Sequence, residues 1–208
     1  MMIVIVQVPD PAKDPDSRQK MIRSAALLLR EQGFTGTSFG DVLARSGAPR
    51  GSIYHHFPGG KNEMIEEAVS FAGGYTDKVM KDAAQRVSPD RLVAGFIDVV
   101  RKTLEENDYR AGCPVAAVAV ETHAKAPQLE KAAAEAFGSW ARTLTDALVD
   151  AGADPDRAAR LATMTVTSVE GAIIVCRASH DTTALEQIQQ ELVALYRGAL
   201  PDPALPDQ

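Results

Sequence analysis

The 208-residue chain is poor in cysteine and in aromatic residues. Its two cysteines, Cys113 and Cys176, are far apart in the sequence and form no CxxC pair, so we expect neither a zinc site nor a disulfide framework. Aromatic residues make up 5% of the chain and alanine is abundant, a balance that favours closely packed helices over sheets. Because 45% of the residues are hydrophobic, the chain can still bury a core, and we expect an all-α fold.

The sequence also lacks the short motifs of common enzyme classes. It contains no HExxH, GxSxG or GxGxxG pattern and no phosphate-binding loop. His123 and His180 belong to no paired motif. Glu121 and His123 are two residues apart, so on a helix they would point to different faces. We therefore expect no enzyme, no cofactor and no metal site.

Long apolar runs are missing as well. The stretch MMIVIVQV at residues 1–8 is far shorter than the ~20 residues that span a bilayer, and it has neither a positive segment nor a cleavage site. The proline-rich stretch that follows it reads as a linker. We expect residues 1–15 to be a flexible arm, or an over-extended start of the reading frame, and residues 201–208 to be a disordered tail. We expect no membrane partner and a cytoplasmic location.

Acidic residues are absent from one stretch, Gly47 to Lys61, although the whole chain carries 28 Asp and Glu against 22 Lys and Arg, a net charge of −6. From Ser17 to Lys61 there are seven basic and two acidic residues, whereas residues 73–208 hold 14 basic and 20 acidic ones. A basic segment on an acidic body is typical of a small nucleic-acid-binding module attached to a second domain.

Start and stop signals divide this basic segment into short helices. Either residue of the pair Asp16-Ser17 can cap a first helix, which Gly33 ends. Either residue of Thr37-Ser38 can cap a second helix, with Asp41 in capping-box spacing from the serine, and Gly47 ends it. A third short helix begins at a proline two residues later, and a Pro-Gly-Gly turn separates it from a long fourth helix.

The second and third helices, joined by Ser46-Gly47-Ala48, form a helix-turn-helix. The third helix is short and polar, with Ile53 as its inward anchor. Its N-terminal end presents Arg50 to a major groove, where arginine can pair with guanine. Tyr54 and His55 would direct their polar tips along the phosphates. The alternative is an ordinary helical hairpin with a polar surface.

These residues resemble the N-terminal domain of TetR-family transcriptional repressors. The likeness rests on Thr37-Ser38-Phe39, on the run SGAPRGSIYHHF from Ser46 to Phe57 and on Lys61, within residues 17–70. It implies a three-helix DNA-binding head, a helical regulatory body, and a homodimer that a small ligand releases from a palindromic operator. The predicted DNA-binding residues are Thr37, Ser38, Pro49, Arg50, Gly51, Ser52, Tyr54, His55 and Lys61. Among them, the resemblance implies that Thr37, Tyr54 and Lys61 contact phosphates.

Two features point to a subgroup of that family. The Gly59-Gly60 pair before Lys61 is one residue longer than the common form, and a GCPVA stretch runs from Gly112 to Ala116. Together they resemble the LmrA/YxaF-like regulators, which implies a hydrophobic or aromatic ligand. We place the DNA-binding domain at residues 16–62 and a helical regulatory and dimerisation domain at residues 63–200.

The helices of the second domain hold polar residues inside apolar stretches, which could line a ligand pocket. One wall would come from two helices, the second of which carries the single tryptophan. A tryptophan more often belongs to the core than to a ligand site. The opposite wall would come from residues that recur at helical spacing within LATMTVTSVEGAIIVC. The predicted ligand-binding residues are Cys113, Val118, Glu121, Phe137, Trp140, Leu144, Met164, Thr167, Ser168 and Gly171.

The last two helices each carry an apolar stripe at steps of three or four residues, which favours a four-helix interface between two copies. The alternative is that these stripes pack inside their own body. The predicted interface residues are Leu161, Val169, Ala172, Ile173, Leu185, Ile188, Leu192 and Tyr196. A second hypothesis for the whole domain is a dimerisation scaffold that answers to a protein partner or to no ligand. A pocket of several hundred Å³ would favour a ligand, and a filled core would favour the scaffold.

Overall fold

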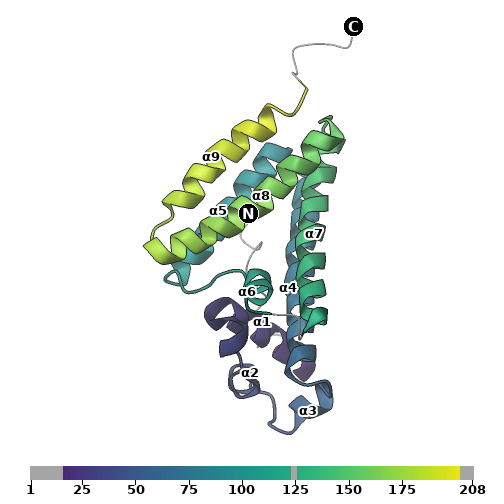
Figure 1. Cartoon of the computed structure of the whole chain (residues 1–208), viewed down its shortest axis with the longest axis vertical. Coiled ribbons are helices and arrows are strands. Elements are labelled where there is room, and N and C mark those ends of the chain that lie inside the picture. The colour runs from purple at the N-terminus through teal and green to yellow at the C-terminus, as the bar shows by residue number, and fades with distance from the viewer. Residues whose placement is uncertain (1–15, 123–125, 202–208) are drawn as a thin grey trace. The chain divides into compact units, whose positions relative to one another are not determined.

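The computed structural model describes residues 16–122 and 126–201. Over these residues the regular structure is helical and includes no strand, which confirms the predicted all-α fold (Figure 1). The predicted arm at residues 1–15, the tail from residue 202 onwards and His123 lie outside the described residues.

The chain divides into two compact units. The head unit comprises residues 16–75 and 110–137, and the body unit comprises residues 76–109 and 138–201, within the described residues. The predicted domain boundary at residue 62 lies at the start of helix α4 (Lys61–Ala84), whereas the division between the units falls inside α4 and inside α7 (Pro127–Asp150). A segment from the middle of the chain therefore packs with the N-terminal helices.

The head unit holds the three predicted N-terminal helices and one more. Its helices, besides the first parts of α4 and α7, are α1 (Ser17–Gly36), α2 (Phe39–Ser46), α3 (Ser52–His56) and α6 (Pro114–Glu121). Helix α6 packs on α1, and α1 also packs on α2. The largest fully buried side chains of this unit include Met21, Leu29, Ile53, Phe57, Met64 and Ile65.

The predicted caps at Asp16, Ser38 and Gly47 are present, whereas α1 runs past its predicted end at Gly33 and α3 begins at Ser52, after the proline predicted to open it. The Asp16 carboxylate accepts a hydrogen bond from the Arg18 N–H at 3.0 Å. Ser38 and Asp41 form a full capping box at the start of α2, and Gly47 ends that helix in the left-handed conformation with φ of 66°. Gly33 interrupts α1 with φ of 75° and ψ of −177°, so the chain bends there and runs on to Gly36.

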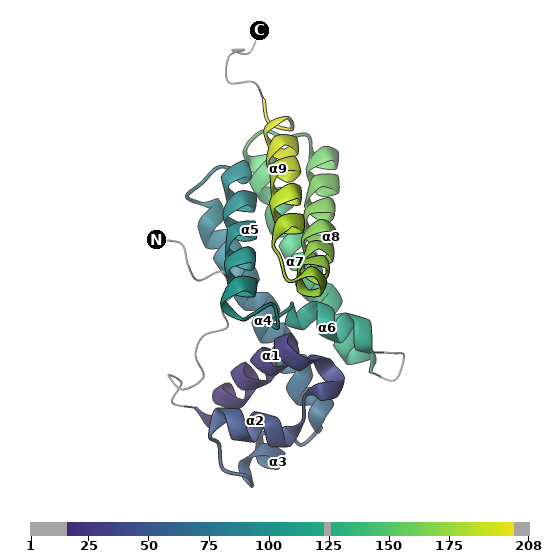
Figure 2. The same ribbon diagram turned by 90° about the vertical axis from the view of Figure 1, so that its left-hand side faces the viewer.

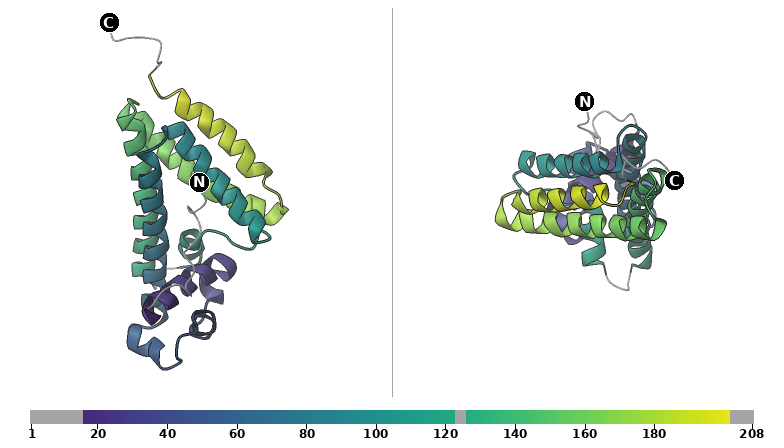
Figure 3. Two further views of the ribbon diagram at one scale, coloured as in Figure 1. Left: turned by 180° about the vertical axis from the view of Figure 1, so that it is seen from behind. Right: turned by 90° about the horizontal axis from the view of Figure 1, so that it is seen from above.

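In the body unit, α5 (Pro89–Glu106), α8 (Pro155–Ser179) and α9 (Thr183–Arg197) pack against one another, and the second parts of α4 and α7 run at an angle to them (Figures 2 and 3). Proline opens α5 and α8 at the first turn, where the missing N–H has no intrahelical partner in any case. The core is apolar, and its fully buried members include Val93, Ile97, Leu104, Leu148, Ala158, Cys176, Leu185 and Tyr196.

Among the described residues, α8 is the one helix that is long and apolar enough to cross a membrane, judged by length and composition alone. The sequence was expected to contain no such apolar run. The inner face of α8 packs in the body core through residues such as Leu161, Val169 and Cys176. A core helix passes the same test, because apolar residues on its packed face raise its average hydropathy.

Candidate DNA-binding surface and regulatory pocket

The α2–α3 connection and α3 present an exposed surface that is anchored from below. Ile53 and Phe57 are fully buried, so they fix α3 on the head core. Pro49, Arg50 and Gly51 are exposed at its start, and His55 is exposed further along. A Cβ added at Gly51 would meet no atom within 4 Å, so the backbone there is open to close approach by a large partner.

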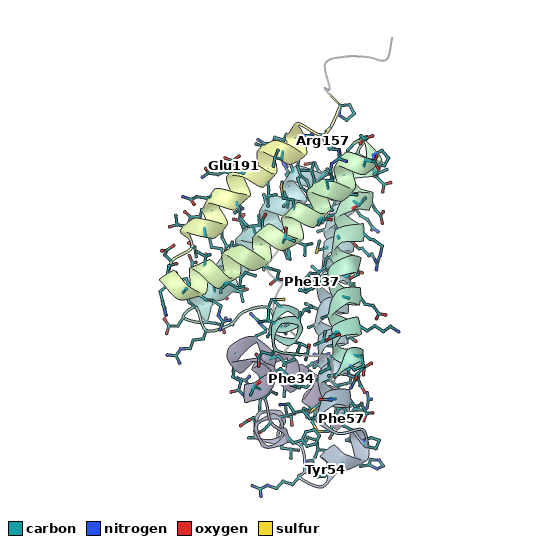
Figure 4. All side chains as sticks on the ribbon, in the orientation of Figure 1. Phe34, Tyr54, Phe57, Phe137, Arg157 and Glu191 are labelled. Carbon is teal, nitrogen blue, oxygen red and sulfur yellow. The ribbon has the colours of Figure 1, made fainter. Side chains whose placement is uncertain are left out.

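Tyr54 is the most exposed aromatic side chain of this surface, with 70% of its area accessible. Its ring packs edge-on against Phe39 of α2, with ring centroids 5.6 Å apart and an interplanar angle of 86°. Figure 4 labels Tyr54 on α3 together with the buried Phe57. Phe39 therefore orients Tyr54, a role that was not predicted, since the motif Thr37-Ser38-Phe39 does not reveal which side chain Phe39 contacts.

Three of the predicted DNA-binding residues donate hydroxyl hydrogen bonds to other groups of the head unit. Thr37 is fully buried and donates to the Gly33 carbonyl at 2.7 Å, so its side chain does not face a phosphate, and that part of the prediction is corrected. Ser38 donates to the Asp41 carboxylate at 2.5 Å as part of the cap. The Ser52 hydroxyl donates to the Pro49 carbonyl at 2.7 Å.

Lys61 also differs from its predicted role as a phosphate clamp. Its ammonium donates to the Phe34 carbonyl at 2.7 Å and lies 4.4 Å from the centre of the Phe34 ring. Desolvation lowers the pKa of Lys61, and the Glu121 carboxylate partly opposes that change. The ammonium is thus directed into the head, because a carbonyl and an aromatic face offer it two partners there.

The positive charge of the head is mostly engaged within the chain. Of the seven basic residues from Ser17 to Lys61, five contact other groups of the head unit, namely Arg18, Arg23, Arg30, Arg45 and Lys61. Arg50 is exposed at the start of α3. Its guanidinium is therefore an exposed positive charge at the α2–α3 surface.

The predicted ligand-binding residues are divided between the two units. Cys113, Val118, Glu121 and Phe137 belong to the head unit, and the other six belong to the body unit. Val118 is buried, and the Cys113 sulfur accepts the Ala116 N–H at 3.5 Å as the cap of α6. Figure 4 labels Phe137, which is half-buried on α7.

A small pocket lies in the body unit, and two of the predicted ligand-binding residues, Trp140 and Leu144, line it. Its volume is about 10 Å³, room for roughly one water molecule. The pocket is almost wholly apolar, and Glu170 is its one charged lining residue among those described. The lining residues that were not predicted are Met80, Phe96, Thr165, Val166, Val169 and Glu170.

The other predicted wall is wrong in its orientation. Met164, Thr167 and Gly171 are exposed on α8, and Ser168 is half-buried beside them. Continuing along the same face, Ile174 and Val175 are 59% and 53% exposed. This α8 outer stripe, defined as Met164, Thr167, Ser168, Gly171, Ile174, Val175 and Ala178, carries no charged residue.

The predicted dimer stripe faces the opposite way. Seven of its eight residues are buried within the single chain, and Ile188 packs half-buried against the same core. These side chains leave no exposed apolar face for a second copy, so this residue assignment is corrected. They pack inside their own body unit, which is the alternative that the sequence left open. The seven buried residues are Leu161, Val169, Ala172, Ile173, Leu185, Leu192 and Tyr196.

Tyr196 offers a test of that correction. The Thr165 hydroxyl donates to the Leu161 carbonyl at 2.8 Å and also lies 2.9 Å from the Tyr196 hydroxyl, with which it forms a buried hydrogen bond in which either hydroxyl can be the donor. Burial raises the pKa of Tyr196 to about 12, and the hydrogen bond with Thr165 partly opposes the rise. The folded chain therefore disfavours the phenolate, and the resulting stability is present below pH 10 and lost as the pH rises through about 12.

Tyr196→Phe is expected to lower the free energy of unfolding by about 0.5–1.5 kcal/mol at pH 7, since one buried hydrogen bond is lost. Its stability should also fall less than that of the parent above pH 10. Urea unfolding at pH 7 and pH 11 measures both effects, and sedimentation velocity should give the parent's mass. A change of mass without loss of stability would return Tyr196 to a subunit interface.

A short recognition helix held on a buried base, with an exposed arginine and tyrosine, defines a DNA-binding protein of the helix-turn-helix class. Comparison with known proteins gives the same answer. Residues 21–68 match the family described as bacterial regulatory proteins, tetR family, and residues 89–191 match the C-terminal domain of LmrA/YxaF-like transcriptional regulators.

Known relatives extend the match over most of the chain. An uncharacterized HTH-type transcriptional regulator of Mycobacterium tuberculosis is 39% identical over 191 residues, covering 89% of this chain and 96% of that protein. The HTH-type transcriptional regulator LmrA of Bacillus subtilis is 31% identical over 174 residues, covering 83% and 93%. The chain belongs to the TetR family of transcriptional regulators, with an LmrA/YxaF-like C-terminal domain, and it is not an enzyme.

A solved structure shares the fold. It is a cysteine mutant of the TetR family transcriptional regulator CifR, complexed with 26-base-pair double-strand operator DNA. Its TM-score is 0.70 at 18% sequence identity, and the match covers 87% of this chain and 95% of that one. The resemblance stated from the helix-turn-helix residues and from GCPVA is thereby confirmed at the level of the family and subgroup.

Proposed function

We propose that the chain is a homodimeric, cytoplasmic transcriptional repressor whose two α3 helices enter successive major-groove faces of a palindromic operator. The observation that carries the proposal is the exposed α2–α3 surface, where Arg50 in the turn before α3 and Tyr54 on α3 are exposed beside the buried anchors Ile53 and Phe57. Arg50 would pair with a guanine, and Tyr54, steadied by Phe39, would bind a phosphate. Pro49, Gly51 and His55 would lie along the same DNA surface.

The homodimer is supported by the α8 outer stripe. Ile174 and Val175 are each more than half exposed in the single chain. Small residues at Gly171 and Ala178 would let a second α8 approach closely, and a two-fold axis would bring the same patch of both copies together. This stripe replaces the buried residues that the sequence assigned to the interface.

For release, we propose a hydrophobic or aromatic ligand that enters the body pocket between Met80, Phe96, Trp140 and Leu144. Binding would require these side chains to move, because about 10 Å³ is far below the ~300 Å³ of a typical ligand site. Met80 is unbranched and flexible, which lowers the cost of opening. The small volume equally favours the second candidate, a dimerisation scaffold that answers to a protein partner or to no ligand.

The test of the whole proposal begins with a duplex that the protein selects from a random-sequence library. A palindromic site whose half-sites lie about 10–10.5 base pairs apart, or a multiple of that, is the expected result. Selection of a single unrepeated half-site would contradict the dimeric reading. Repression is then tested with a reporter gene behind the selected site, where expression should fall when the protein is present.

Compounds that bind the body pocket are expected to change the fluorescence of Trp140, the single tryptophan of the chain. By linkage, a compound that weakens DNA affinity must itself be weakened by DNA by the same factor. Screening hydrophobic and aromatic compounds by fluorescence, then titrating DNA with and without each binder, measures both factors.

Val166→Phe provides the matched control, because the larger side chain would fill the pocket from its half-buried edge. It should weaken compound binding and leave the affinity for the selected duplex close to that of the parent. Binders that change Trp140 fluorescence and leave DNA affinity untouched would favour the scaffold over the ligand-released repressor.

A further inference from the structure

Two backbone N–H groups of the head unit bind one carboxylate beside a lysine that holds the same turn. Glu121, the last residue of α6, accepts hydrogen bonds from the N–H groups of Phe34 at 3.1 Å and Thr35 at 2.8 Å. Lys61 donates to the carbonyl of the same Phe34 at 2.7 Å. We call this arrangement of Gly33, Phe34, Thr35, Lys61 and Glu121 the Glu121 clasp; Figure 4 labels Phe34, which belongs to it.

The clasp depends on the conformation of Gly33. This residue has φ of 75°, and the bend turns the next two N–H groups outward from α1. A Cβ at Gly33 would lie 2.0 Å from Oε1 of Glu121, so any larger residue would expel the carboxylate. The backbone and the carboxylate are therefore fitted to each other over a separation of more than 80 residues in the sequence.

The clasp holds both ends of the helix-turn-helix. On one side, the Gly33 carbonyl accepts the Thr37 hydroxyl at 2.7 Å, and Ser38 directly after it caps α2. On the other side, Lys61 opens α4 four residues after Phe57, the residue that caps the end of α3. Fixing the turn before α2 and the residue after α3 restricts the orientation of the recognition helix between them.

Glu121 reaches the head from the regulatory part of the sequence. It lies within residues 89–191, the span that matches the LmrA/YxaF-like C-terminal domain, yet α6 packs with α1 in the head unit. The start of α6 is tied to α1 as well, because Gly112 and Arg30 exchange two hydrogen bonds of 2.8 and 3.3 Å. Helix α6 is thus attached to α1 near both of its ends.

We propose that Glu121 is a positioning residue for DNA binding, through which α6 sets the orientation of α2 and α3. The proposal rests on the DNA-binding role of α3 given above. The carboxylate contacts no DNA itself and acts by fixing the turn from Gly33 to Ser38. Any movement of α6 that withdraws Glu121 releases two N–H groups and loosens both ends of the helix-turn-helix.

The test compares Glu121→Ala and Glu121→Gln with Glu130→Gln, a control that changes an exposed glutamate on α7 of the same unit. The amide of Glu121→Gln offers one acceptor oxygen and places an NH₂ group against the second N–H donor, so it cannot replace the carboxylate. Both variants at position 121 are expected to keep near-parental helix content and to bind the selected duplex about tenfold or more weakly. The control should stay within about twofold of the parent.

Hydrogen exchange separates positioning from mere stabilisation. In both variants at position 121, the amides of Phe34 and Thr35 should exchange faster, and so should those of α2 and α3. Lys61→Met should have a similar effect, and adding it to Glu121→Ala should weaken DNA binding less than the two single effects combined, since both hold one turn. Circular dichroism and thermal unfolding give the folded fraction for each measurement.

Two outcomes would overturn the proposal. In the first, Glu121→Ala lowers thermal stability while the folded protein keeps the parent's DNA affinity and the parent's exchange in α2 and α3. In the second, Glu121→Ala changes neither the DNA affinity nor the hydrogen exchange of α2 and α3, and thermal stability is also unchanged. If the parent itself selects no duplex, the proposed function fails, and the exchange rates of α2 and α3 still decide whether Glu121 positions them.

Discussion

Arg50→Ala is expected to reduce the preference for the selected duplex over random DNA by about 1–3 kcal/mol, because a bidentate pair with guanine would be lost. Arg50 is exposed, so the change should leave helix content and thermal stability close to those of the parent. Fluorescence anisotropy with the selected duplex and with a scrambled duplex, at several salt concentrations, measures the preference and the salt dependence separately.

Two companion variants isolate the cause. Arg50→Lys keeps the positive charge but lacks the planar fork, so it should keep the salt dependence and still lose the preference. Arg45→Ala removes one positive charge from the head at a residue that pairs with Glu31 at 2.9 Å. It should lower binding to both duplexes alike. If Arg50→Ala discriminates between the duplexes as well as the parent does, α3 is not placed in the groove as proposed.

Much of the fold could be predicted because local signals decide where helices begin and end. The capping box of Ser38 and Asp41, the left-handed Gly47 and the prolines that open α5 and α8 act over three or four residues, so a sequence reveals them directly. The family was recognised for the same reason, since its motif is a contiguous run.

The faces of α8 show where such prediction stops. Two stripes run along this helix at the same spacing, one through Leu161 and Cys176 and the other through Met164 and Val175. Periodicity identifies both stripes but does not say which one faces the core. The observed packing reverses the assignment made from the sequence, so predicted pocket residues are exposed and predicted interface residues are buried.

The contacts of Lys61 and Glu121 could not be predicted for a different reason. Their partners, Phe34 and Thr35, are 27 and 86 residues away, so no local pattern announces the contacts. Family likeness assigned Lys61 to a phosphate, and Glu121 was assigned to a mainly apolar ligand wall. Each of these charged groups instead binds a backbone group exposed by the bend at Gly33, whose role becomes visible once the chain is folded.

The α8 outer stripe leads to the second large effect. Val175→Asp is expected to produce a folded monomer, because the aspartate would meet its own symmetry copy in a two-fold interface that excludes water. Breaking such an interface should cost about 3–5 kcal/mol of association free energy. Val175 is 53% exposed in the single chain, so the same change costs the isolated fold little. Sedimentation equilibrium measures the mass, and circular dichroism measures the helix content.

The monomer should also lose the selected operator, since two linked heads gain affinity that one head cannot reach alone. Val149→Asp is the matched control, because Val149 is a partly exposed valine on α7 of the same unit, 37% accessible, and lies outside the stripe. It should remain dimeric and bind the operator as the parent does. Leu192 is unsuitable for this test, as it is 2% exposed and a charge there would disrupt the body core itself. If Val175→Asp stays dimeric with full operator affinity, the two copies meet through another surface.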